Sequence, residues 1–357
     1  MCVMRMKENP LLVCADVKPS RPDFTVVGVF NCGGVRTEEG VTLVCRVAEM
    51  CSDRGDGVIR IPHVETGGTI GAMEFNRSDP RYDFTDPRAI VERDGRRVAA
   101  LSSMSSLRRA FAPDGVHFVC DDTPLFPLDP RSEEWGAEDP RITRLEDGQY
   151  AMTYSSVSRN GVGVSLALSD DLVTWNRQGM ILPPANKDTV IFPKKIDGTW
   201  WMLHRPILDG LGASDIWIAS SSDLVHWGGH QHLAGCRTGQ PWEMRKIGAG
   251  AHPMEVDAGW LVLYHGVDEK EHYRVGALLL DKQDPRSVLA RTPQPIFQPE
   301  EPYERNGFFS NTVFPCAAWI EGDEVVTYYG GADSCVCGAR LSLSDIMDSL
   351  VYGRRAL

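Results

Sequence analysis

Short runs of β-branched and aromatic residues recur along the whole chain, separated by turns rich in Gly, Asp and Pro. Runs such as GVTLVCRV, GQYAMTYSS and GWLVLYHGV have the length and composition of β-strands that are entered from tight turns. Helical periodicity is nearly absent. The best helix candidate is the short amphipathic segment 344–350, SDIMDSL, which begins with a good N-cap residue. The pattern therefore predicts an all-β protein with a short C-terminal helix.

Related units repeat along the chain. The segment 169–175, SDDLVTW, resembles 222–227, SDLVHW, and the two tryptophans lie 52 residues apart. A weaker copy, 112–118, APDGVHF, ends 57 residues before Trp175. A period of about 50 to 60 residues with several strands per unit is typical of a β-propeller. A β-sandwich with chance similarity is the alternative, but a sandwich needs no recurring Asp-Leu-x-x-Trp turn.

Composition and charge indicate the general class of protein to which the chain belongs. The 357 residues are 42% hydrophobic and 24% charged, which is ordinary for a globular protein with a large core. A net charge of −12 argues against a nucleic-acid partner and an anionic membrane surface, so any bound anion must meet a local basic cluster. The N-terminus does not resemble a signal peptide and the ten cysteines are scattered, which predicts a cytoplasmic protein with reduced thiols. We expect a single domain over residues 1–357.

The tripeptide Asp-Pro-Arg recurs in this chain, at 79–81, 86–88, 129–131, 139–141 and 284–286. Proline suits the first residue of a strand because its φ is fixed and it lacks an N–H donor. In a propeller, a carboxylate just before an innermost strand would face the central pocket. We favour that interpretation for Asp139, and a simple turn for Asp79, Asp129 and Asp284.

Eight short motifs, in order along the chain, together resemble glycoside hydrolase family 130, the β-mannoside phosphorylases. They lie at 29–35, 43–47, 138–141, 186–188, 203–206, 246–250, 264–267 and 329–333. The resemblance runs from about residue 9 to residue 346, and the segments 15–21 and 82–88 look like the branch that acts on β-1,2-linked mannosides.

The resemblance implies a five-bladed β-propeller with a short C-terminal helix. The sequence itself contains up to six strand-rich units. We therefore expect the segment around Arg46 and the segment from Asp86 to Phe118 to share one blade, with an insertion between them.

Cleavage of a glycosidic bond with inversion needs a protonated carboxyl and a nucleophile on the opposite face of the sugar. Inorganic phosphate is already an anion, so a phosphorylase needs one acid and a basic cradle but no second carboxylate as base. By resemblance Asp139 is the general acid. We expect the neighbouring Glu138 to raise its pKa by like-charge repulsion. The proton passes to the leaving group directly or through a mannose hydroxyl, and the sequence leaves both routes open.

The resemblance assigns phosphate binding to Lys187, Arg205, Lys246 and His265, which suit an anion by charge or hydrogen bonding. The remaining substrate-binding candidates are Asn31, Arg46, Asp86, Glu138, Arg141, Tyr273 and Asp333. Tyr273 and Trp242 are candidates for stacking on sugar faces, although packing explains either equally well. The hydrolytic branch of the family places carboxylates at phosphate-binding positions. This chain shows no such replacement, which favours phosphorolysis.

The sequence thus predicts an inverting β-mannoside phosphorylase that converts β-1,2-linked manno-oligosaccharides and phosphate into α-mannose 1-phosphate, and that builds oligomannosides in reverse. We expect no metal and no cofactor beyond phosphate as co-substrate. The partners are mannose, manno-oligosaccharides, and phosphate or mannose 1-phosphate, and family members are often homo-oligomers. The alternatives are a β-1,2-mannosyltransferase that uses GDP-mannose and a carbohydrate-binding propeller without catalysis.

Overall fold

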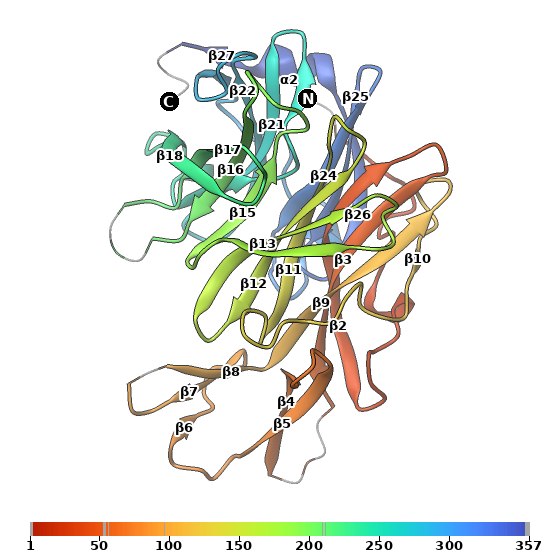
Figure 1. The fold of residues 1–357 in the computed structure, drawn as a ribbon, viewed down its shortest axis with the longest axis vertical. Helices are drawn as coiled ribbons and strands as arrows, with labels where there is room; N and C mark the ends of the chain where they lie inside the picture. The colour runs from red at the N-terminus through yellow and green to blue at the C-terminus, as the bar shows by residue number, and fades with distance from the viewer. Residues whose placement is uncertain are drawn as a thin grey trace.

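Almost all of the secondary structure is antiparallel β (Figure 1). The computed structural model describes residues 3–353 except 53, 54, 56, 96, 209 and 211. In this part of the chain the helical elements are α1 (Pro302–Arg305), α2 (Leu343–Ser349) and the 3-10 turns Cys14–Asp16 and Pro241–Glu243. The predicted all-β fold is therefore confirmed. Within the described residues, no helix is long and apolar enough to cross a membrane.

The first group of strands, group I, joins the two ends of the chain. Its order is β1-β26-β25-β24. The strands are β1 (Val3–Arg5), β24 (Val313–Glu321), β25 (Glu324–Gly331) and β26 (Cys335–Ser342). Val3 pairs with Leu341, so a strand from the N-terminus completes a sheet built from C-terminal strands. Helix α2 follows β26 where the sequence predicts the tail helix, and its N-cap is Ser342, whose hydroxyl accepts the Asp345 N–H.

Groups II and III together form an eight-stranded sheet. Group II holds β2 (Phe24–Arg36), β3 (Val41–Cys51), β9 (Ser103–Ala112) and β10 (Val119–Cys120). Group III holds β11 (Gly136–Arg144), β12 (Tyr150–Ser158), β13 (Gly161–Ser169) and β14 (Asn176–Leu182). Each group is antiparallel, and a single parallel pair, Gly136 with Ser105, joins them.

Two further antiparallel groups follow in chain order. Group IV holds β15 (Asn186–Ile191), β16 (Trp200–Pro206), β17 (Ile216–Ser221) and β18 (Trp227–Ala234). Group V holds β19 (Lys246–Ala249), β20 (Met254–Val256), β21 (Gly259–Val267), β22 (Tyr273–Leu280), β23 (Val288–Arg291) and β27 (Val351–Tyr352). In both groups each long strand lies beside its neighbour in sequence, as tight turns between short strands require.

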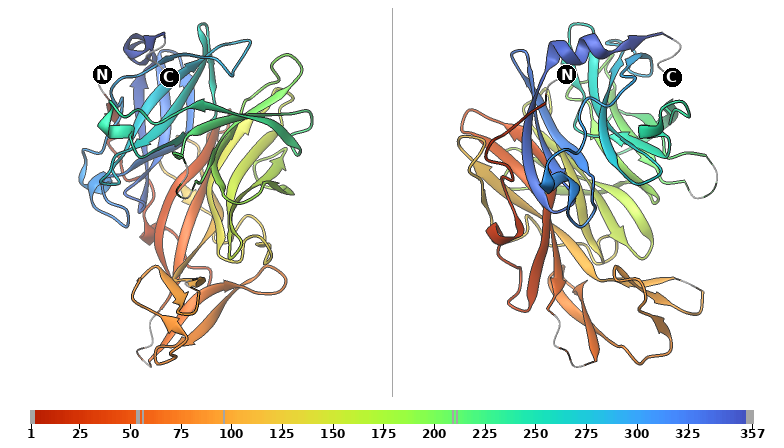
Figure 2. Two further views of the ribbon diagram at one scale, coloured as in Figure 1. Left: turned by 90° about the vertical axis from the view of Figure 1, so that its left-hand side faces the viewer. Right: turned by 180° about the vertical axis from the view of Figure 1, so that it is seen from behind.

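An insertion, residues 52–102, leaves the body between β3 and β9 (orange in Figure 1). It consists of β4 (Val58–Val64), β5 (Ile70–Asn76), β6 (Tyr82–Asp83), β7 (Ala89–Glu92) and β8 (Val98–Leu101). Arg46 on β3 pairs with Leu107 on β9, so these segments share a sheet as predicted. Asp86 does not belong to that sheet, because it lies within the insertion. Figure 2 shows the insertion at the end of the molecule opposite both chain ends.

Five clusters of buried apolar side chains lie between the groups. Each cluster joins strands of two neighbouring groups, I with II, II with III, III with IV, IV with V, and V with I, and the cluster between II and III also takes in Val64 of the insertion. Trp175 packs between II and III, and Trp227 borders the cluster between III and IV, as expected for core residues. The pairings leave every group packed against two neighbours. The insertion has a small cluster of its own.

The repeated Asp turn has a common geometry. Asp171 Oδ1 accepts the N–H groups of Val173 and Thr174 at 2.8 and 2.7 Å. Asp223 Oδ1 does the same for the two residues that follow at equal spacing, and Asp114 caps the weaker copy. The sequence repeat therefore reflects a repeated structural turn.

Gly136, at the junction of groups II and III, has a φ of +111°, and a Cβ there would collide with the backbone oxygen of Ser105. We predict that Gly136→Ala costs more than about 3 kcal/mol of unfolding free energy, because strain and a backbone clash add. Gly148→Ala is the matched control. Its φ is +92° with no atom within 4 Å of the added Cβ, so it should cost only about 1–2 kcal/mol. Chemical denaturation of both variants measures the difference, and equal losses would contradict the prediction.

Candidate active site

Residues from all five groups meet in one small cavity of about 100 Å³, which we call the central cavity. Its lining residues are Asn31, Arg46, Asp139, Lys187, Asp188, Arg205, His265, Tyr273, Phe309, Thr312, Phe314 and Asp333. Eight of these are residues that the sequence predicts for the site. The chain brings them together from positions up to about 300 residues apart, which no local motif reveals.

Four of the polar lining residues have left-handed backbone. Their φ angles are +46° at Asn31, +48° at Asp139, +54° at Asp188 and +49° at Asp333. Strands β2, β11 and β15 each shift register at the residue concerned. Such a bulge adds a residue to one strand and redirects a side chain. Non-glycine residues in this conformation are strained, and strain of this kind concentrates at functional sites.

Asp139 is the carboxylate most closely surrounded by donors. Its Oδ1 accepts the amide N–H of Asn31 and lies 3.0 Å from Arg46 Nη1, while Oδ2 lies 3.7 Å from Lys187 Nζ. Burial acts to raise the pKa of Asp139. The positive charges of Arg46 and Lys187 outweigh burial and lower this pKa to about 2. Asp139 is therefore a carboxylate near neutral pH.

The expectation that Glu138 raises the pKa of Asp139 is wrong. Glu138 Oε1 lies 2.7 Å from Arg46 Nη2, so the same guanidinium binds both carboxylates. This shared cation cancels the repulsion on which the prediction depended. The Arg46 Nε also donates to the hydroxyl of Ser105, which fixes the plane of the guanidinium.

Asp333 is the carboxyl in the central cavity that keeps a proton near neutral pH. Burial raises the pKa of Asp333 to about 7, and the negative charge of Asp139 adds to that shift against the opposing effect of Arg46. Two neighbouring carboxyls thus have very different proton affinities. The site therefore combines one ionised carboxyl and one that is protonated about half the time at pH 7.

Four basic candidates converge at the central cavity. Lys187, Arg205 and His265 line it, and Lys246 lies beside it, with Nζ 5.0 Å from the Tyr273 ring centroid and 3.2 Å from Glu271 Oε2. Burial lowers the pKa of Lys246 to about 8, assisted by the charges of Arg205 and Lys187. Mutual repulsion of this kind is relieved when an anion binds.

His265 is neutral in this environment. Burial lowers its pKa well below the ordinary value, and the charge of Arg205 lowers it further. Its Nε2 lies 3.1 Å from Arg205 Nη1 and 3.4 Å from Asp188 Oδ2, so this ring nitrogen faces one donor and one acceptor. The sequence left the charge state of this residue open, and burial decides it.

Asp188 is a site residue to which the sequence analysis gave no role. Its side chain is 1% exposed; Oδ2 lies 2.7 Å from Arg205 Nη1 and Oδ1 accepts Arg141 Nη2 at 3.1 Å. Arg205 and Arg141 keep the pKa of Asp188 low despite burial. Its place in the 186–188 motif, next to Lys187, is the signal that pointed to it.

Arg141, Asp86 and Trp242 lie outside the central cavity. Arg141 is buried behind it and donates to the backbone oxygens of Asp139 and Gly250. Trp242 is buried against Tyr264 at a ring distance of 5.8 Å, so packing explains it.

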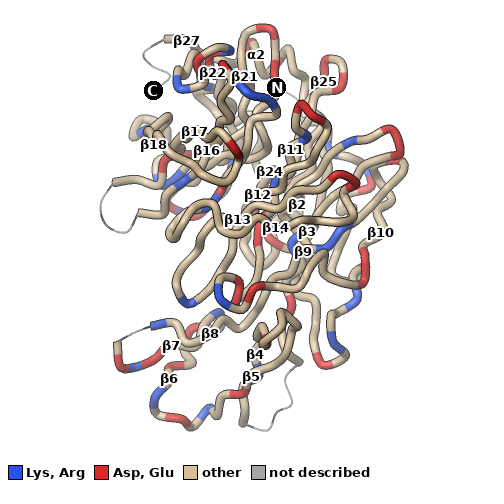
Figure 3. The backbone as a smooth tube through the Cα atoms, viewed as in Figure 1, with Lys and Arg blue, Asp and Glu red and all other residues tan. Residues whose placement is uncertain are grey.

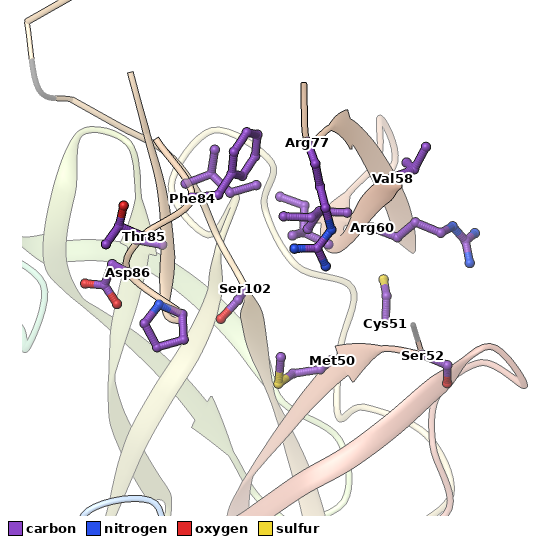
Figure 4. Close-up of a pocket in the computed structure, with 15 residues that line it drawn as sticks. Met50, Cys51, Ser52, Val58, Arg60, Arg77, Phe84, Thr85, Asp86 and Ser102 are labelled. Carbon is purple, nitrogen blue, oxygen red and sulfur yellow. The ribbon is translucent and has the colours of Figure 1, made fainter. Parts of the chain in front are cut away.

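Asp86 lines a separate pocket of about 340 Å³ between the insertion and the end of β3. Figure 4 shows it on one side of this pocket, with Arg77 and Arg60 on the other. Its carboxylate accepts the N–H of Arg88 and pairs with the Arg88 side chain. Its predicted substrate contact stays a prediction.

No group of three or more His, Cys, Asp or Glu side chains in the described residues is arranged to hold a metal ion. Phe309 and Thr312, which the sequence analysis missed, come from the segment between α1 and β24, and Phe314, also missed, is the second residue of β24. They add apolar surface and one hydroxyl to the lining of the cavity.

Comparison with known proteins places this geometry in context. Residues 99–351 match the family model Glyco_hydro_130, described as beta-1,4-mannooligosaccharide phosphorylase. The chain is 41% identical over 356 residues to a beta-1,2-mannobiose phosphorylase of Listeria innocua, covering 98% of this chain and 99% of that protein. It is 38% identical to a 1,2-beta-oligomannan phosphorylase of a Thermoanaerobacter species, covering 68% and 80%. The structure of the Listeria protein with beta-1,2-mannobiose matches with a TM-score of 0.90 over 98% of this chain and 99% of that one.

The raised pKa of Asp333 predicts a pH-dependent stability. The unfolded chain ionises this carboxyl above its ordinary pKa of 3.8, while the folded protein holds the proton up to about pH 7. The folded state therefore loses stability as pH rises from about 4 to 7. Asp333→Asn removes this loss, so at pH 8 it should be more stable than wild type by up to about 4 kcal/mol, with the gain vanishing toward pH 4. Denaturant unfolding at both pH values tests this. Asp257→Asn, at an exposed position, controls for loss of one charge, and a gain of equal size at pH 4 and 8 would contradict the prediction.

Proposed function

The chain belongs to glycoside hydrolase family 130, and on that premise we propose that it is an inverting phosphorylase of β-1,2-linked manno-oligosaccharides. The observation that carries the proposal is the composition of the central cavity. It holds Asp139, which lies 3.7 Å from Lys187 Nζ and faces a cluster of basic side chains from groups IV and V. The other ionised carboxylate, Asp188, is paired with Arg141 and Arg205. A phosphorylase needs this combination, because phosphate replaces the water and the base of a hydrolase.

The proposed reaction exchanges two bonds at the anomeric carbon of the terminal mannose. A phosphate oxygen attacks that carbon from the side of Lys187 and Arg205, and the bond to the glycosidic oxygen breaks. The leaving sugar takes a proton that Asp139 supplies, directly or through a mannose hydroxyl. Inversion converts the β-linkage into α-mannose 1-phosphate, and reversal of the same steps builds a longer mannoside from that product.

Asp139 must gain a proton before it acts as an acid, and the basic cluster explains how. The nearby cations lower the pKa of Asp139 to about 2. A phosphate dianion between Lys187 and Arg205 neutralises those charges and adds its own negative field. Both effects raise the pKa of Asp139. Phosphate thus serves as nucleophile and as the group that allows the acid to hold its proton.

The sugar contacts follow from the remaining residues of the central cavity. Asn31, Arg46 and Asp333 present amide, guanidinium and carboxyl groups to the hydroxyls of the mannose unit, with Glu138 held beside them by Arg46. Buried polar groups of this kind reject sugars that leave them unpaired. Tyr273, next to His265 at a ring distance of 5.6 Å, offers an aromatic edge.

The β-1,2 linkage is part of the proposal. The family model is described by β-1,4-mannooligosaccharides, whereas the relatives at 41% and 38% identity are named for β-1,2-linked substrates. Because identity to the Listeria protein extends over almost the whole chain, we favour β-1,2.

We propose further that the five groups are the blades of one propeller domain spanning residues 1–357. The ring of five apolar clusters, each between two groups, supports a closed arrangement, and β1 in group I supplies the closing strand. The nine described cysteines are free, which supports a reducing compartment such as the cytoplasm.

The first test is synthesis from α-mannose 1-phosphate and mannose, read as release of inorganic phosphate. We predict release by wild type and a loss of about 10²- to 10⁴-fold in Asp139→Asn, as expected for removal of a general acid. Linkage analysis of the product should show β-1,2. Absence of release by wild type would refute the proposal, and transfer from GDP-mannose instead would identify a transferase.

A second test addresses the basic cluster. Arg205→Lys keeps the charge but removes the planar fork of donors, so KM for phosphate should rise on the order of tenfold while binding of mannobiose changes little. Arg131→Lys, at a side chain that is 88% exposed and pairs with Asp129, is the matched control. An unchanged KM for phosphate in Arg205→Lys would show that Arg205 does not bind phosphate.

A further inference from the structure

A second, much larger cavity lies between the insertion and group III. It has a volume of about 870 Å³, within the range of ligand pockets in proteins. Strands β5 to β8 of the insertion form one wall, and Trp135 with the β12–β13 turn forms the other. We call it the distal pocket. It does not overlap the central cavity or the pocket that contains Asp86.

The distal pocket is lined by equal numbers of negative and positive side chains. Its lining contains three carboxylates and three guanidinium groups, Glu74, Asp79, Glu92, Arg81, Arg97 and Arg159. Several are already paired, such as Arg159 with Glu134 at 2.5 Å and Arg81 with Asp79 at 2.7 Å. A pocket for phosphate or another anion would have an excess of positive charge, as the central cavity does. Balanced, hydrogen-bonding side chains suit a neutral ligand with many hydroxyls.

Three aromatic side chains, Phe75, Tyr82 and Trp135, line this pocket. Tyr82 is held by Phe75 in an edge contact with ring centroids 5.0 Å apart, and by Arg81 at 5.3 Å. Trp135 is half-buried, and its ring has no aromatic or cation contact among the described residues. A partly exposed aromatic side chain in a polar pocket offers apolar surface on which a sugar ring can pack.

The distal pocket is joined to the central cavity by a short path of contacts. Trp135 immediately precedes β11, and Asp139 follows four residues later, roughly 13 Å along an extended chain. Gly136, next to Trp135, pairs with Ser105, whose hydroxyl accepts Arg46 Nε at 2.9 Å. Arg46 in turn contacts Asp139. The strand that carries the acid therefore also carries the aromatic residue of the distal pocket.

We infer that the distal pocket binds mannose units of a longer β-1,2-manno-oligosaccharide whose reacting end occupies the central cavity. This inference rests on the proposed function. It assigns the enzyme a preference for oligosaccharides over the disaccharide, because only a chain of several units reaches both cavities. The insertion between β3 and β9 then serves as the element that sets chain-length preference.

The experiment compares β-1,2-mannobiose with β-1,2-mannotetraose in two ways. Equilibrium binding without phosphate reports affinity with no turnover, and phosphorolysis reports kcat/KM. We expect wild type to favour the tetraose in both. Trp135→Ala should reduce that preference about fivefold while leaving the values for mannobiose near wild type.

Two further variants distinguish loss of the distal pocket from misfolding of the protein. Asn160→Trp, on the exposed β12–β13 turn that lines the distal pocket, fills the space without removing a half-buried ring, and should cause the same selective loss. Trp217→Ala is the matched control. It removes another half-buried tryptophan, whose ring contacts His232 in group IV, and it should leave the preference for the tetraose unchanged.

The outcomes separate the two proposals. Equal affinity of wild type for the two sugars, or a preference that survives both Trp135→Ala and Asn160→Trp, would overturn the distal pocket even if mannobiose is phosphorolysed normally. Absence of phosphorolysis with either sugar would overturn the proposed function. The binding measurement without phosphate would then still show whether the distal pocket binds the longer sugar.

Discussion

The buried carboxylate of Asp188 is the group on which the charge arrangement of the site depends. It lies between Arg141 and Arg205, with its side chain 1% exposed, and contacts both. Guanidinium groups taken out of water are costly unless paired and hydrogen-bonded, and removing one partner leaves an uncompensated charge. Asp188 allows two buried cations to converge, and Arg141 then ties β11 to group V through Gly250.

The same requirement explains the strained backbone. A regular strand alternates its side chains between two faces, so it cannot present consecutive polar groups to a common centre. The bulges in β2, β11 and β15 turn Asn31, Asp139 and Asp188 out of that alternation. The apolar clusters between groups hold these strands in place. Packing remote from the cavity thereby maintains an unfavourable conformation within it.

Much of the fold was predictable because strand and turn signals are local. The repeated Asp turns at 171 and 223, the short tail helix, and the pairing of the Arg46 segment with the segment around Leu107 all match the structure. Most of the site residues also converge. Their protonation was not predictable, because it depends on distances between groups: Arg46 contacts both Glu138 and Asp139, which reverses the expected shift. Asp188 was missed for a related reason, since its role lies in the charges around it.

The difference in pKa between Asp139 and Asp333 gives the central cavity a defined charge state. The two carboxyls affect one another, and Arg46 influences both, yet the proton resides on Asp333 because Lys187 and Arg46 hold Asp139 in its ionised form. Binding of an anion at Lys187 weakens the cation that favours ionised Asp139. The proton balance between the two carboxyls then shifts toward Asp139. In the proposed mechanism Asp139 holds its proton only when phosphate is bound at Lys187, so the acid and the nucleophile become available together.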